Sequence, residues 1–137
     1  MVSASADYGQ VFKHLTYQNA VTFTKANVAM SNENDGIAMN SKMIAVNWKS
    51  VSTVAVFNAN KSDSFSPALP LIRGHTGAIY DLQWSPFEDR LLATCADDGK
   101  VKMWIFDDEN GCKENLTEAD MELDAHARKT LNVRWHK

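Results

Sequence analysis

Residues 74–104 constrain the fold of this chain more than any other stretch. They open with Gly-His-Thr-Gly, continue as an alternating apolar run, and close with Asp-Asp-Gly-Lys-Val-Lys-Met-Trp. A Gly-His pair followed at this distance by Asp-Gly, a short strand and a tryptophan is typical of one four-stranded blade of a β-propeller. A propeller closes with about 4–8 blades. Because each blade takes about 40–45 residues, the 137 residues hold about three blades at most.

The remaining pattern also favours short strands separated by turns. We expect them at residues 43–48, 53–57, 69–73, 79–84, 91–95, 100–106 and 121–123. Asp98-Gly99 predicts a tight hairpin, since glycine supplies the positive φ that such a turn needs. Gly74-His75 recurs as Ala125-His126, and the run ending at Trp84 recurs at Trp135, both at an offset of 51 residues. This shared register indicates a repeat.

The sequence therefore predicts an all-β chain, an incomplete propeller of about two blades plus the first strand of a third. Residues 1–35 form an N-terminal segment that precedes or closes onto the first blade. Residues 36–73 form a degenerate first blade, and residues 74–124 form the second. Residues 125–137 begin a third blade that the chain leaves truncated.

Four polar or amphipathic residues of the second unit fit one buried hydrogen-bond network. Asp98 would accept from His75, His75 would bond the hydroxyl of Thr94, and that hydroxyl would meet the indole N–H of Trp104. Burial of such groups is costly unless each is paired. In the first unit Phe57 stands where Trp104 would be, so we expect packing alone to hold that blade.

The same residues do not indicate an enzyme. A histidine and a carboxylate could act as a base and its orienting group, but no nucleophile, glycine-rich phosphate loop or HExxH motif accompanies them. Cys95 and Cys112 have no metal-site spacing, and Cys95 is expected to be a buried free thiol. We therefore expect no catalysis, no cofactor and no metal site.

Charge and hydropathy limit the partners. The net charge is −3, which gives no overall basic excess for binding nucleic acid. No apolar run approaches the ~20 residues that cross a bilayer, so no membrane span is expected. Reduced cysteines fit the cytoplasm. An incomplete ring leaves open sheet edges, and these predict self-association.

The chain resembles the N-terminal part of the propeller of the coronins, actin-binding WD-repeat proteins. The resemblance rests on Val-Phe-Lys-His at residues 11–14, on residues 37–45, and on the two Gly-His-type units at residues 74–104 and 125–136. It implies an actin-filament-binding protein that regulates cytoskeletal dynamics without catalysis, located in the cytoplasm at the actin cytoskeleton. The alternative is a general WD-repeat scaffold for protein interactions that is not specific for actin.

Under this resemblance, basic side chains would meet the acidic surface of actin. The candidates are Lys13, Lys25, Lys42 and Lys49. The chain departs from the coronin pattern in having no arginine before Arg73. Coronins use an arginine in the first-blade region, and lysine does not reproduce its bidentate geometry.

Overall fold

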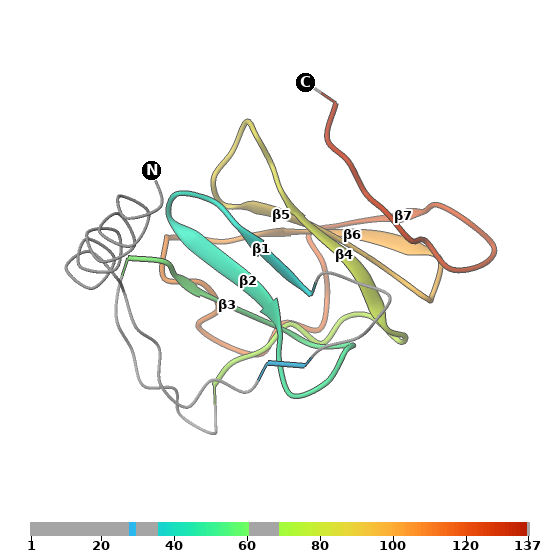
Figure 1. Cartoon of the computed structure of the whole chain (residues 1–137), viewed down its shortest axis with the longest axis horizontal. Coiled ribbons are helices and arrows are strands. Elements are labelled where there is room, and N and C mark those ends of the chain that lie inside the picture. Colours follow the sequence, from blue (N-terminus) through green and yellow to red (C-terminus); the bar gives the residue numbers. More distant parts are fainter. Residues whose placement is uncertain (1–27, 30–35, 61–68, 137) are drawn as a thin grey trace, which may run out of the picture.

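The computed structural model describes residues 28–29, 36–60 and 69–136, and all regular structure in them is β (Figure 1). The first sheet has the antiparallel order β1 (Ile37–Met39), β2 (Met43–Asn47) and β3 (Val54–Asn58). The second has the antiparallel order β4 (Ile79–Trp84), β5 (Leu91–Ala96), β6 (Lys100–Ile105) and β7 (Met121–Asp124). In each sheet, consecutive strands are neighbours, as in a propeller blade.

The turns of the second sheet follow from local chemistry. Gly99 has a φ of 77° between β5 and β6, and the amide of Lys100 donates to Asp98 Oδ1 at 3.1 Å. The β4–β5 turn is held by Ser85, whose buried Oγ accepts from the amides of Phe87 and Glu88 at 3.1 and 3.3 Å. Turns of this kind favour the antiparallel pairing of the strands that flank them.

The two sheets share one hydrophobic core. Alternate residues of β2 and β3 face alternate residues of β4, β5 and β6. Its members include Met43, Val54, Leu82, Trp84, Leu92 and Trp104. The indole of Trp84 also donates to the carbonyl of Ala38 in β1 at 3.1 Å. This shared core makes the two sheets adjacent layers of one unit.

Two segments are extended without forming a full strand. Within residues 69–73, expected as a strand, only Ile72 makes bridges, antiparallel to Val54 and parallel to Leu116. Residues 125–129 lie on the β5–β6 turn, and residues 133–135 lie beside β4, held partly through side chains. The amide of Thr130 donates to the carbonyl of Ala96, and the indole of Trp135 donates to the carbonyl of Gln83. Scattered bonds of this kind do not make a ladder.

Among the described residues, no helix has the length and hydropathy to cross a bilayer.

Candidate functional site

The structure brings together the four residues that the sequence placed in one network. His75, in the loop that enters β4, places Nδ1 2.9 Å from Asp98 Oδ2 and Nε2 2.7 Å from Thr94 Oγ1. The indole of Trp104, in β6, donates to the same Thr94 Oγ1 at 3.0 Å. The network therefore ties an entry loop, a hairpin turn and two strands to one another.

The proton positions follow from the partners. Burial is the main reason why the pKa of His75 is lowered, which favours the neutral imidazole. Burial alone would raise the pKa of Asp98, but hydrogen bonds from His75 and from two backbone amides outweigh it and leave that pKa lowered. Since a carboxylate only accepts, His75 Nδ1 must carry the proton. Nε2 then accepts from the Thr94 hydroxyl, whose oxygen accepts from Trp104.

The network is buried, and its polar groups are paired with one another. Thr94 and Trp104 have no exposed surface, and His75 is 7% exposed. Both ring nitrogens of His75 are engaged, so neither is available to take a proton from a substrate. No group of three or more His, Cys, Asp or Glu side chains among the described residues could hold a metal ion. The arrangement acts as a structural clasp.

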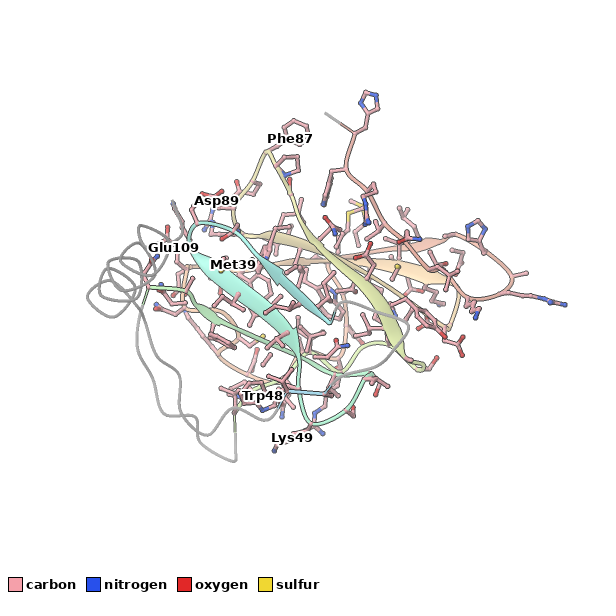
Figure 2. All side chains as sticks on the ribbon, viewed as in Figure 1. Met39, Trp48, Lys49, Phe87, Asp89 and Glu109 are labelled. Carbon is pink, nitrogen blue, oxygen red and sulfur yellow. The ribbon has the colours of Figure 1, made fainter. Side chains whose placement is uncertain are left out.

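The candidate lysines lie in different places. Lys42, in the β1–β2 turn, is 2.7 Å from Glu109 and 3.3 Å from Asp89. Hydrogen bonds to these two carboxylates, Glu109 first, raise the pKa of Lys42. Lys49 is exposed in the β2–β3 turn, on the opposite side of the molecule from Asp89 and Glu109 (Figure 2). Lys13 and Lys25 lie outside the described residues. Lys42 thus links the two sheets, whereas Lys49 lies in an exposed turn away from that contact.

Sequence reasoning missed a second buried polar contact next to the network. Lys102 is only 8% exposed, and its Nζ donates to the carbonyl of Gly74 at 2.6 Å and lies 3.0 Å from Glu122. The alternation of side chains along β6 could have predicted that Lys102 is buried, because residues two apart on a strand share a face and Trp104 is buried. This contact fixes the loop that carries His75.

The fold and the network agree with comparisons to known proteins. Residues 67–104 match the family described as WD domain, G-beta repeat. The chain is thus a WD-repeat protein, and its two sheets are of the propeller-blade type.

Within that class, the relatives and a solved structure are coronins. Coronin-2B of Xenopus laevis is 31% identical over 118 residues, covering 85% of this chain and 24% of the relative. A coronin-like protein of Schizosaccharomyces pombe is 30% identical over 117 residues, covering 80% and 20%. The crystal structure of the WD40 domain from Toxoplasma gondii coronin superposes with a TM-score of 0.73 at 26% identity, covering 85% of this chain and 30% of that one. The chain belongs to the coronin family, and it spans about a quarter of the length of the coronin-2B relatives that it matches.

We predict that Thr94→Val lowers the free energy of unfolding by about 2 kcal/mol or more. Valine has nearly the shape of threonine but leaves His75 Nε2 and the Trp104 N–H buried without a partner. Thr94→Ser is the matched control, since it keeps the hydroxyl and loses one methyl group, at a cost of about 1 kcal/mol. Urea unfolding measures both variants. Equal losses in the two would show that the hydroxyl does not hold the network.

We predict that stability falls as the pH drops below 6.5, the ordinary pKa of histidine. Because the pKa of His75 is lowered in the folded state, the unfolded state takes up the proton first. The contribution of His75 is therefore complete above 6.5 and is lost below it. The lowered pKa of Asp98 adds a further loss below 3.8.

Unfolding free energies measured across this range test the prediction, with His75→Asn as the comparison. The variant should show a flatter profile between neutral pH and mildly acidic pH. A wild-type stability that rises on acidification through this window would be the opposite of the expected sign.

Proposed function

We propose that this chain supplies the first two blades of a coronin propeller that binds actin filaments and regulates their dynamics. In this proposal residues 36–73 are the first blade, residues 74–124 the second, and residues 125–137 the beginning of a third. The observation that carries it is the relation to coronins over 85% of the chain, together with a coronin WD40 structure of the same fold. The protein would act in the cytoplasm, at the actin cytoskeleton.

The proposed mechanism is surface docking without catalysis. The one buried histidine–carboxylate pair in the described residues has both imidazole nitrogens occupied, so it supports the fold rather than a reaction. A rigid β scaffold instead presents side chains from its turns, the usual sites of recognition. Basic side chains there would steer and orient the encounter with an acidic filament.

Of the candidates named from the sequence, Lys49 is the best placed for such docking. It is exposed, and a backbone φ of 62° sets its turn. Lys42 is already engaged by Asp89 and Glu109, so its substitution would test the contact between the sheets more than docking.

We predict that Lys49→Glu weakens cosedimentation with actin filaments several-fold at moderate salt, because it reverses a charge that faces the filament. Lys113→Glu is the control. It makes the same change at an exposed lysine whose ion pair is with Asp108, in the β6–β7 loop. Equal weakening by both variants would contradict a role for Lys49.

The unmodified protein decides the broader question. If it does not pellet with filaments under any salt condition, actin binding is wrong and the general WD-repeat scaffold becomes the better interpretation.

We also propose that the chain self-associates through its open sheet edge. All four residues of β7 are exposed and its outer edge has no ladder partner among the described residues. Met121 and Leu123 in β7 and Ile105 in the neighbouring strand β6 are each about half exposed. Unpaired edges and exposed apolar side chains favour pairing with a second copy.

Light scattering on the purified chain should show a mean mass that rises with concentration. Leu123→Lys should reduce that rise, since a charge on the face would have to be desolvated on association. A mass that stays at that of a single chain over the whole concentration range would rule out self-association.

A further inference from the structure

The two ends of the sheets differ in charge. At one end lie the turn at residues 48–53, the loop at residues 73–78, the turn at residues 97–99 and the segment at residues 125–129; we call this the basic end. At the other lie the turns at residues 40–42 and 85–90 and the first part of the β6–β7 loop, residues 106–113; we call this the acidic end. β2 and β4 run from one end to the other, β2 toward the basic end and β4 away from it (Figure 1).

The basic end has an excess of positive side chains, while the acidic end has an excess of negative ones. The basic end carries Lys49, Arg73, Arg128 and Lys129 against Asp97 and Asp98. The acidic end carries Glu88, Asp89, Asp107, Asp108 and Glu109 against Lys42, Arg90 and Lys113. The overall charge of −3 conceals this separation. A partner would therefore meet opposite fields at the two ends.

The buried network strengthens the positive character of the basic end. Asp98 turns its carboxylate inward, where the side chain is 8% exposed and accepts from His75 and from the amides of Thr76 and Lys100. Of the two acidic side chains at this end, Asp98 is therefore buried, and its negative charge is stabilised by the hydrogen bonds that it accepts. Its basic side chains, by contrast, belong to exposed residues.

The loops of the basic end form one connected surface. The amide of Ile79 donates to the carbonyl of Val51 at 2.8 Å, which joins the first sheet to the entry of the second. The amide of Asp97 donates to the carbonyl of Ala78 at 2.9 Å, and that of His126 donates to the carbonyl of Gly99 at 3.1 Å. Backbone bonds therefore run from one loop to the next across the whole end.

Arg128 and Lys129 are held in place by contacts with the β5–β6 turn and with β4. A Cβ built on Gly99 would lie only 2.6 Å from the carbonyl oxygen of Arg128, so this segment lies directly on the β5–β6 turn. Lys129 Nζ lies 5.6 Å from the centre of the Tyr80 ring, and the Tyr80 hydroxyl donates to Asp97. A cation stacked on a ring that is itself anchored has less freedom to lose on binding.

We propose that the basic end is the docking surface for an acidic protein face, with Arg128 and Lys129 as its principal contacts and Lys49 as a third. This inference rests on the proposed function, in which the acidic face belongs to the actin filament. It also sets the orientation, because the acidic end would be repelled and would point away from the filament.

The test is cosedimentation with actin filaments over a range of salt concentrations, using matched charge reversals at the two ends. Arg128→Glu/Lys129→Glu changes the basic end. Lys42→Glu is avoided because it breaks the contact between the sheets, so Arg90→Glu/Lys113→Glu provides the same change at the acidic end. Arg128→Glu alone is included because it leaves the Lys129–Tyr80 contact intact. Thermal unfolding checks that each variant is folded.

We expect the basic-end double variant to bind roughly tenfold or more weakly at low salt and to lose most of the salt dependence of the parent protein. The acidic-end double variant should bind as the parent does. Equal binding by the two double variants, or equal loss, would overturn the assignment of the docking end. Failure of the parent protein to pellet would instead count against the proposed function itself, so the two failures can be told apart.

Discussion

The hydroxyl of Thr94 is the point on which the second sheet depends. It is fully buried, it donates to His75 and it accepts from Trp104, so one oxygen joins the entry loop to two central strands. His75 in turn donates a hydrogen bond to Asp98 in the hairpin turn. Because an unpaired polar group at this depth would be costly, each member requires the others. The arrangement of the loops at the basic end follows from this clasp.

The first sheet is held in a different way. Phe57 replaces the indole found in the second sheet, and it packs edge-on against Trp48 with ring centres 6.2 Å apart. Contacts from the second sheet secure it further. The Trp84 indole bonds to the carbonyl of Ala38, and the backbone of Gly111 lies against the carbonyl of Val56. Apolar packing and long-range contacts thus stabilise the first blade, whereas a local hydrogen-bond network stabilises the second. Together they give a rigid support on which charged turns are displayed.

Local patterns in the sequence predicted much of the fold. The alternation from Ile79 to Trp84, the Asp98-Gly99 turn and the spacing of His75 to Trp104 predicted an all-β repeat, and the structure has one. Contacts between distant residues could not be read in the same way. Lys42 meets Asp89 and Glu109 only because two sheets pack at a particular angle, and no periodicity in the sequence encodes that pairing. The charge separation between the ends was hidden for the same reason, since its residues come from loops that are far apart along the chain.

The most direct test of the clasp is the tautomer of His75, observed by nitrogen NMR of the imidazole at neutral pH. The network requires a neutral ring with its proton on Nδ1 and a bare Nε2 that accepts from Thr94. A resonance pattern showing a protonated Nδ1 and an unprotonated, hydrogen-bonded Nε2 is the result that this account predicts. A proton on Nε2, whether in the other neutral tautomer or in an imidazolium, would contradict it.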